Sequence, residues 1–285
     1  MGDKILISEI FGPVLQGEGH FAGTPSIFIR TFGCNFRCPA FGIEPPVKEN
    51  TEVKSIIADI DKYTDLEDLP VVKTGCDTYY AIYPEFKKFT KWYTVDELKD
   101  KIESIINEAR ADLGPFGTYD VVFTGGEPLL PSWQKFYTNF LRDILENPIG
   151  VKTITFETNA TQPLIKEFSD IVYDVGDVYF SMSVKLPNSG HTLEETIKPD
   201  VIKSYIDVSP FSWLKFVVST EDEVKLIRDM EKKIKPCCDV FLMPCGGEKE
   251  LFDKNQKEVY NYCIKYNYRF SPRLQVSVWN NGIGI

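Results

Sequence analysis

The sequence has little histidine and no long apolar run. Only two of its 285 residues are histidines, His20 and His191, so a zinc or iron site built mainly from imidazoles is nearly excluded. No stretch approaches the roughly 18 apolar residues of a membrane-spanning helix, and the first residues lack the apolar core of a signal peptide. We therefore expect a cytosolic (cytoplasmic) protein that has no membrane partner.

Clusters of basic residues are also missing. The chain has 42 Asp and Glu against 32 Lys and Arg, which gives a formal net charge of -10. Nucleic-acid binding needs grouped Lys and Arg side chains that displace counterions from phosphates, so we expect no nucleic-acid partner. The 43% hydrophobic and 26% charged content is typical of a folded protein with a sizeable core.

Seven cysteines are present, an odd number. Without a secretory route they are expected to be thiols or metal ligands rather than a disulfide framework. Cys34 and Cys38 lie in "CNFRCPAF", where a cysteine at position 41 would complete an iron–sulfur triplet, but Phe41 stands there. From this pair alone, a zinc half-site or two buried thiols remain open alternatives.

The hydrophobic pattern predicts an α/β fold. Short, nearly continuous apolar runs indicate strands covered on both faces: 26–31, 120–124, 152–156, 178–183, 214–218, 239–243 and 274–278. Capping boxes predict helices that begin at Thr94 and Thr220, and 132–146 and 254–266 also have helical patterns. Strands alternating with helices indicate a parallel sheet or a (β/α) barrel, with chemistry at the carboxyl ends of the strands.

Residues 39–75 do not follow this alternation. The segment is acidic and bounded by prolines, with one short helix expected near 51–62. We interpret 1–285 as a single domain and 39–75 as an insertion within it. Directly after the segment comes "GCDT", so that Cys76 follows Cys38 with 37 residues between them.

Five further motifs carry polar or glycine residues suited to a ligand site. "LQGEG" (15–19) and "TGGEP" (124–128) offer glycine backbone that a flat or charged ligand can approach closely. "FETNAT" (156–161) and "SMSVK" (181–185) lie at or near the ends of predicted strands, and "FLMPCG" (241–246) does so later in the chain. The chain closes with "SPRLQVSVWNNGIGI".

In this order, the motifs resemble the radical S-adenosylmethionine (SAM) superfamily and, within it, the 7-carboxy-7-deazaguanine synthase family. The resemblance implies a partial (β/α)6-type radical SAM barrel with an insertion between the second and third cluster cysteines. It also implies the reaction: radical ring contraction of 6-carboxy-5,6,7,8-tetrahydropterin to 7-carboxy-7-deazaguanine with loss of ammonia, in queuosine or other 7-deazapurine biosynthesis. The implied cofactors are a [4Fe–4S] cluster, SAM and Mg²⁺. The implied partners are a flavodoxin- or ferredoxin-type electron donor and a second copy in a homodimer.

The resemblance assigns roles residue by residue. For the cluster the implied ligands are Cys34, Cys38 and Cys76, and for Mg²⁺ the implied ligand is Thr78. The residues implied for SAM are Gly75, Asp77, Gly125, Gly126, Glu127, Ser183, Val184, Lys185, Met243, Pro244, Cys245 and Gly246. The residues implied for the substrate are Leu15, Gln16, Gly17, Arg30, Thr124, Gln275 and the terminal carboxylate of Ile285.

Two departures from the family pattern affect the interpretation. The family has two residues between the second and third cysteines, whereas this chain has 37. The longer loop corresponds to roughly four doublings of length, and the added entropic cost of closing it is on the order of 2.5 kcal/mol. Thiolate–metal bonds contribute on the order of 10 kcal/mol or more, with zinc as the analogue, so we expect the site to survive. Gln275 stands where the family usually has His, so an amide can keep a hydrogen bond but cannot transfer a proton.

Several alternatives stay open. Cys245 is a second candidate for the third ligand, Arg30 could form a surface ion pair, and Asp77 could be only a turn residue. At the level of function, the alternatives are a glycyl-radical activase and a catalytically degenerate binding protein of the same fold. The sequence does not identify the downstream pathway, the reductant, the oligomeric state or the purpose of 39–75.

Overall fold

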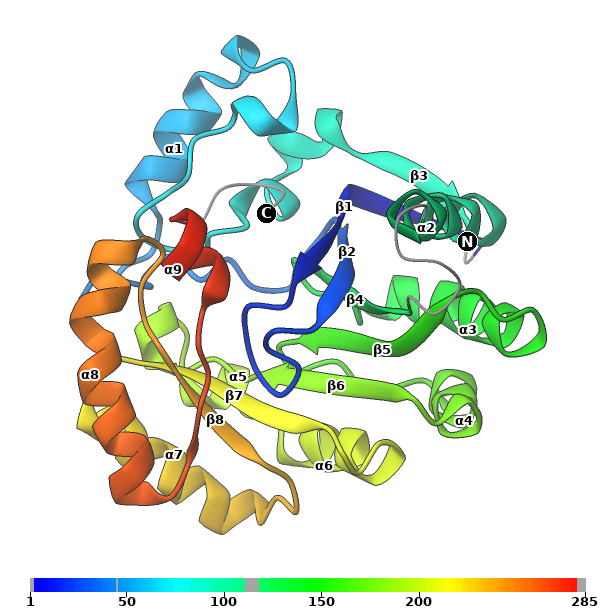
Figure 1. Ribbon diagram of the computed structural model, residues 1–285. Coiled ribbons are helices and arrows are strands. Elements are labelled where there is room, and N and C mark those ends of the chain that lie inside the picture. The colour runs from blue at the N-terminus through cyan, green and yellow to red at the C-terminus, as the bar shows by residue number, and fades with distance from the viewer. Residues whose placement is uncertain (1–2, 45, 111–117, 281–285) are drawn as a thin grey trace.

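The computed structural model describes residues 3–44, 46–110 and 118–280. A curved, nine-stranded sheet forms its centre (Figure 1), with the strand order β3-β1-β2-β4-β5-β6-β7-β8-β9. From β2 to β9 every neighbouring pair is parallel, whereas β1 and β3 are antiparallel at one edge. The strands are β1 (Lys4–Leu15), β2 (Pro25–Thr31), β3 (Lys91–Thr94), β4 (Tyr119–Gly125), β5 (Val151–Thr158), β6 (Val178–Ser183), β7 (Trp213–Val218), β8 (Val240–Pro244) and β9 (Arg269–Phe270).

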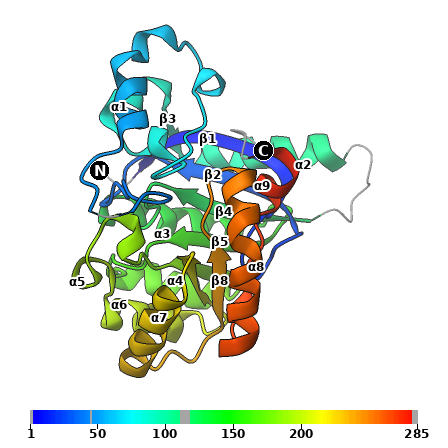
Figure 2. The same ribbon diagram turned by 90° about the vertical axis from the view of Figure 1, so that its left-hand side faces the viewer.

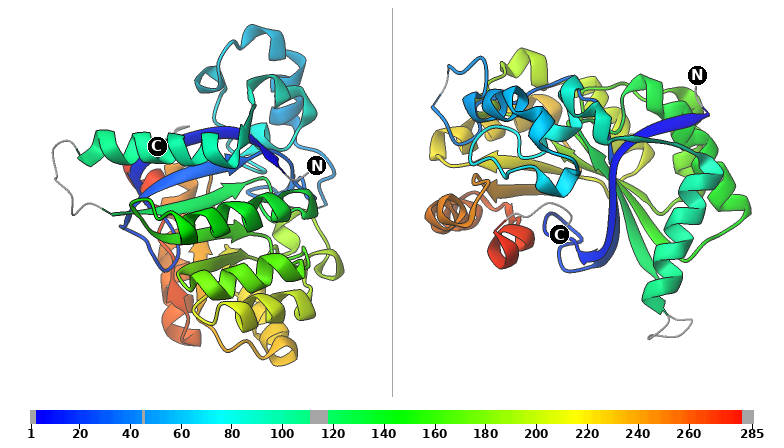
Figure 3. Two further views of the ribbon diagram at one scale, coloured as in Figure 1. Left: turned by 90° about the vertical axis from the view of Figure 1, so that its right-hand side faces the viewer. Right: turned by 90° about the horizontal axis from the view of Figure 1, so that it is seen from above.

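Helices α2, α3, α4 and α6 are stacked along the outer face of the sheet (Figures 1 and 3). Their apolar faces pack with the strands in one core, which includes Leu98, Phe136, Phe156 and Tyr205. The helices are α1 (Thr51–Ala58), α2 (Val95–Arg110), α3 (Pro131–Glu146), α4 (Lys166–Val175), α5 (Leu193–Thr196), α6 (Pro199–Val208), α7 (Glu221–Ile234), α8 (Lys249–Tyr266) and α9 (Leu274–Trp279). Across the described residues, no helix is both long and apolar enough to cross a membrane.

Six of the seven predicted strands are confirmed, and the seventh is wrong. Residues 274–278 alternate apolar and polar, but they form helix α9 instead. The amides of Val276 and Ser277 both bond to the carbonyl of Arg273, at 3.1 and 3.0 Å. Only Val276 is buried, and Val278 is 64% exposed. The alternating apolar residues therefore do not form the buried face of a strand.

Both predicted capping boxes are confirmed. The Glu97 carboxylate accepts the Thr94 amide at 2.8 Å, and Glu223 accepts the Thr220 amide at 3.0 Å. These bonds satisfy amides that lack a partner inside the first turn, and they begin α2 and α7.

The segment 39–75 contains α1 and packs a small core of its own, apart from the main one. It projects from one end of the sheet (Figures 1 and 2). Its apolar side chains Val53, Ile56, Leu66, Leu69 and Val72 pack against Tyr79, Tyr80 and Phe86, which follow it in the chain.

The two ends of the segment meet. The Gly75 amide donates to the Phe41 carbonyl at 2.7 Å, and Asn50 Nδ2 donates to the Thr74 carbonyl at 2.8 Å. Gly75 has φ of +79°, and a Cβ there would lie 2.3 Å from Asn50 Nδ2. Only glycine therefore fits at the point where the chain returns, and Cys76 follows directly beside Phe41.

Candidate functional site

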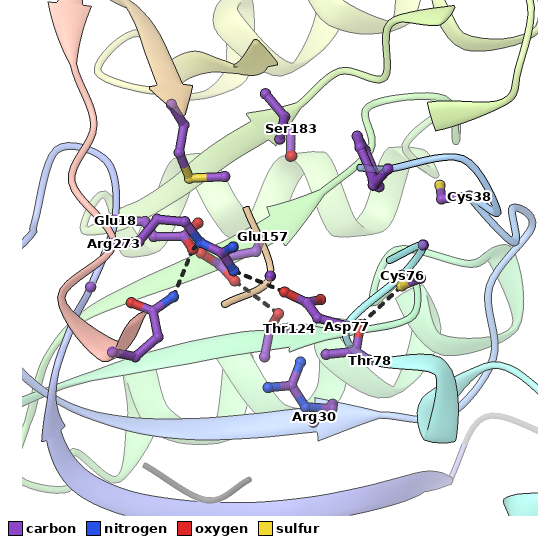
Figure 4. Close-up of a pocket in the computed structure, with 18 of the residues that line it drawn as sticks. Glu18, Arg30, Cys38, Cys76, Asp77, Thr78, Thr124, Glu157, Ser183 and Arg273 are labelled. Carbon is purple, nitrogen blue, oxygen red and sulfur yellow. Dashed lines mark hydrogen bonds and ion pairs between the residues drawn. The ribbon is translucent and has the colours of Figure 1, made fainter. Parts of the chain in front are cut away.

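A cavity of about 260 Å³ opens at the carboxyl ends of the parallel strands (Figure 4). Most residues that the sequence singled out line it. From the cluster and SAM sets these are Cys34, Cys38, Gly75, Cys76, Asp77, Thr78, Gly125, Gly126, Ser183, Lys185, Met243, Cys245 and Gly246. From the substrate set these are Leu15, Gln16, Gly17, Arg30, Thr124 and Gln275.

Of the predicted residues that the structure describes, three do not line this cavity: Val184, Pro244 and Glu127. Val184 and Pro244 are buried and do not line the cavity. Ile285 lies outside the described residues. Glu127 is fully buried behind the cavity; Oε1 accepts from Leu129 N and Thr158 Oγ1, and Oε2 accepts from Asn159 N. Its carboxylate therefore joins β4 to the end of β5 and would have to give up these bonds to hold a ligand directly.

Cys34, Cys38 and Cys76 come from two chain segments and line the same cavity. Figure 4 shows Cys38 and Cys76 at one end of it. Burial raises the pKa of each of the three thiols, to about 12 for Cys38, and neighbouring thiols add to the shift for Cys34 and Cys38. Three desolvated sulfurs that repel one another when ionised need positive charge between them, as a metal group supplies.

Among the described residues, no three His, Cys, Asp or Glu side chains are placed to share one metal ion. A four-iron cluster spreads its cysteines over separate corners, farther apart than the ligands of a single ion. Three cysteines that line one cavity without converging on a single point are compatible with such a cluster.

Gly125 and Gly126 bring the end of β4 against the segment before Cys34. A Cβ on Gly126 would lie 2.3 Å from the Gly33 carbonyl oxygen, and one on Gly125 would lie 2.3 Å from that of Thr31. Gly125 also has φ of +143°. This contact requires glycine at both positions and leaves bare backbone facing the cavity.

Arg30, at the end of β2, forms a buried rather than a surface ion pair. Its Nε donates to Glu9 Oε1 at 2.6 Å, and the Tyr80 hydroxyl donates to the same oxygen at 2.7 Å. Within the part of the chain that the structure describes, the two terminal nitrogens of Arg30 have no hydrogen-bond partner. They remain available to a carboxylate in the cavity.

The residues after Cys76 also face the cavity. Thr78 Oγ1 lies 3.3 Å from the Cys76 sulfur, and Asp77 Oδ2 accepts from Arg273 Nη2 at 2.8 Å. Asp77 is therefore a member of an ion pair and not only a turn residue. Lys185, at the end of β6, donates to Ser183 Oγ at 3.1 Å, and its ammonium lies 5.8 Å from the centroid of the Phe41 ring.

A buried charge network that the sequence analysis missed lines the opposite end of the cavity (Figure 4). Glu18 accepts from Lys215 at 2.5 Å, Arg273 at 2.9 Å and Gln275 at 2.7 Å. Burial raises the pKa of Glu18, but Lys215 and then Arg273 overcome it and hold that pKa well below its usual range. Glu157 extends the network: it lies 3.7 Å from Lys215 and accepts from Thr124 at 2.9 Å.

Gln275 has a fixed orientation. Because its Nε2 donates to Glu18, its Oε1 is left as an acceptor, and this buried atom has no hydrogen-bond partner among the described residues. A Cβ at Gly17 would lie 1.7 Å from that oxygen, so the glycine of "LQGEG" makes room for the amide.

The remaining cysteines differ in exposure. Cys263 is buried in α8 and Cys245 is buried in the cavity wall. Cys237 is exposed and Cys238 is half-buried. The two precede β8, whose first residue is Val240, so Cys237 lies outside the strand that covers the core.

Comparison with known proteins identifies similar chains. No protein-family model matches. The 7-carboxy-7-deazaguanine synthase of Halobacterium salinarum is 28% identical, with 98% of this chain and 92% of that protein covered. The enzyme of the same name from Pyrobaculum aerophilum is 27% identical, with 99% and 97% covered. The crystal structure of QueE from Escherichia coli matches with a TM-score of 0.53 at 18% identity, covering 94% of this chain and 93% of that one.

The solved structure supports the mixed α/β fold, and the curated sequences extend the similarity over nearly the whole chain. The predicted resemblance to the 7-carboxy-7-deazaguanine synthases is therefore confirmed.

Proposed function

We propose that this protein is a radical SAM enzyme that converts 6-carboxy-5,6,7,8-tetrahydropterin into 7-carboxy-7-deazaguanine with loss of ammonia. The observation that carries the proposal is the single cavity in which three cysteines, the Gly125–Gly126 backbone, Lys185 and Arg30 meet. A site for this reaction must hold a cluster, a sulfonium cofactor and an anionic pterin side by side. The curated enzymes named above support the choice of reaction.

The donor set fits the implied cluster. Cys34, Cys38 and Cys76 are three thiols whose pKa burial raises, and Lys185 is the cation that opposes this effect at Cys38 and Cys76. Three protein thiolates leave one iron open for SAM. Together with SAM, the reduced cluster supplies a 5′-deoxyadenosyl radical that abstracts a hydrogen atom from the substrate.

The chain itself binds and orients the two small molecules. The Gly126 amide already donates to the Thr31 carbonyl at 3.3 Å, so it is the backbone carbonyls of Gly125 and Gly126 that can hold the amino group of SAM. Met243 and Gly246 lie along the wall proposed for its adenine. The terminal nitrogens of Arg30 can fork onto the pterin carboxylate. Thr124 and Gln16 supply polar atoms for the ring, and Thr78 supplies a hard oxygen ligand for Mg²⁺.

The proposal includes the finer fold prediction. Parallel strands β2 and β4 to β8 form a partial (β/α)6 barrel, and 39–75 is an insertion between the second and third cluster cysteines within one domain. The hydrogen bond from the Gly75 amide to the Phe41 carbonyl supports this, because it closes the segment at its base. An external one-electron donor of the flavodoxin or ferredoxin class supplies the electron.

Anaerobic reconstitution tests the proposal. The protein is loaded with iron and sulfide, reduced with dithionite, and mixed with SAM, Mg²⁺ and 6-carboxytetrahydropterin. We expect 5′-deoxyadenosine and 7-carboxy-7-deazaguanine, identified by mass spectrometry. SAM cleavage without conversion of the pterin favours the activase alternative, and the absence of any cluster favours the degenerate binding protein.

A further inference from the structure

The loop that carries Cys34 and Cys38 rests on a short segment far away in the sequence. Pro187–Ser189 form a 3-10 turn after β6, and Gly190 and His191 follow. The Ala40 amide donates to the Ser189 carbonyl at 3.3 Å. Gly190, with φ of +93°, meets the Pro39 ring so closely that a Cβ would lie 3.0 Å from it.

His191 makes two contacts with the same loop. Its ring packs against the Phe36 ring at a centroid distance of 4.4 Å and an interplanar angle of 38°, and its Nε2 accepts the backbone amide of Cys38 at 3.3 Å. The other ring nitrogen, Nδ1, faces the Glu195 carboxylate at 3.9 Å. A proton on Nδ1 leaves Nε2 as the acceptor, so the two contacts agree on one tautomer.

Cys38 needs such support. It has φ of +44°, a left-handed backbone conformation that a side chain other than Gly, Asn or Asp rarely adopts. The conformation persists only where surrounding contacts hold it. His191 bonds the Cys38 amide itself, and Gly190 and Ser189 hold the two residues that follow it. The Cys38 side chain lines the cavity wall shared with Cys76.

Resting on the proposed function, we infer that His191 is a positioning residue for the iron–sulfur cluster. By accepting the Cys38 amide it holds the second thiolate in place, and it keeps that amide from donating to a cluster sulfur. Hydrogen bonds to the sulfurs help to set the reduction potential of such clusters. A donor stabilises the more negative reduced state, so withholding one keeps the potential low, as one-electron transfer to a sulfonium requires.

Three variants separate the contacts. His191→Phe keeps the packing against Phe36 but removes the acceptor, whereas His191→Gln keeps an acceptor and loses the aromatic ring. His20→Phe changes the only other histidine of the chain, an exposed residue that stacks on Trp213 at 5.6 Å. All are reconstituted anaerobically as the full chain, and their circular dichroism is compared with that of the wild type.

Two readouts do not depend on turnover: the midpoint potential of the cluster, from an electron paramagnetic resonance redox titration, and the rate of iron release to a chelator. We expect His191→Phe to have a more positive midpoint potential and about 10- to 100-fold weaker iron retention, as for other partners of ligand residues. His191→Gln and His20→Phe should stay close to the wild type.

Unchanged potential and iron release in His191→Phe overturn the inference. Equal impairment of His191→Phe and His191→Gln also overturns it, because the acceptor is then not what matters. A wild-type chain that assembles no four-iron cluster is a separate result, which overturns the proposed function and this inference with it.

Discussion

Arg273 ties the segment that carries Cys76 to both the start and the end of the chain. Its Nη2 donates to Asp77 at 2.8 Å, directly after the cysteine, while its Nε donates to Glu18 at 2.9 Å. Nη1 reaches the carbonyl of Gly246. One buried guanidinium thus fixes three walls of the cavity: the cluster side, the wall proposed for SAM, and the loop proposed for the pterin.

Removal of this guanidinium should destabilise the protein strongly. Arg273→Met removes the ion-pair partner of Asp77 and one of the two cations that bind Glu18, and loss of one member of a buried pair costs about 3–5 kcal/mol. Urea unfolding measures the free energy. The matched control is Arg269→Met, whose ion pair with Asp239 is half-exposed and should change stability by no more than about 0.5 kcal/mol. Equal effects of the two substitutions would contradict the role given to Arg273.

Asn50 should matter for the cluster as well as for its helix. It caps α1 by accepting the Val53 amide at 3.0 Å, and its Nδ2 holds the Thr74 carbonyl next to the return of the chain. Asn50→Ala should lower stability by about 1 kcal/mol and also lower the iron retained after chelation. Thr220→Ala removes the cap of α7, which is far in sequence from Cys34, Cys38 and Cys76. This substitution should lower stability without iron loss. Iron loss in both variants, or in neither, would contradict this account.

Thr78 should decide the response to Mg²⁺. If its hydroxyl is the protein ligand, Thr78→Ala loses the stimulation of turnover by Mg²⁺, whereas Thr78→Ser, which keeps the oxygen, retains it. Turnover is titrated against Mg²⁺ concentration for both variants. A Thr78→Ala protein with the wild-type Mg²⁺ response would contradict the assignment of Thr78 as the ligand.

The charge network should make stability depend on pH in one direction. The pKa of Glu18 is held below its ordinary value of 4.5, chiefly by Lys215 against the opposing effect of burial. A carboxylate with a lowered folded-state pKa contributes stability above its unfolded pKa and loses it as the pH falls toward the folded value. The stability advantage of the wild type over Glu18→Gln should therefore be constant near neutral pH and shrink below about pH 4.5. Urea unfolding of both proteins from about pH 7 down to about pH 4 measures it, and an advantage that grows on acidification would contradict this assignment.

Local patterns predicted the elements well, and the order of motifs predicted most of the cavity wall. The capping boxes at Thr94 and Thr220 illustrate the reason. A capping box is a contact between residues three apart, so the local sequence alone is enough to predict it. The prediction of a strand over 274–278 was wrong because these residues have no neighbouring strand beyond β9 with which to pair. That outcome depends on where the sheet ends, which no local window contains.

The charge network was missed for a related reason. Glu18 and Arg273 are 255 residues apart, and no local sequence pattern around either residue predicts their contact. One signal was present: Lys215 is a single charged residue inside the apolar run "LKFVV". A lysine in a strand covered on both faces must find a carboxylate, and Glu18 and Glu157 are the two that it finds.

The central claim is that the sulfur of Cys76 joins those of Cys34 and Cys38 around one cluster. Iron and sulfide analysis with electron paramagnetic resonance of the reduced protein tests it most directly, on wild type, Cys76→Ala and Cys245→Ala after anaerobic reconstitution. We predict about four irons per chain for the wild type and for Cys245→Ala, and loss of the SAM-responsive cluster signal in Cys76→Ala. A Cys76→Ala protein that keeps its iron and its signal, or a Cys245→Ala protein that loses them, would contradict the account.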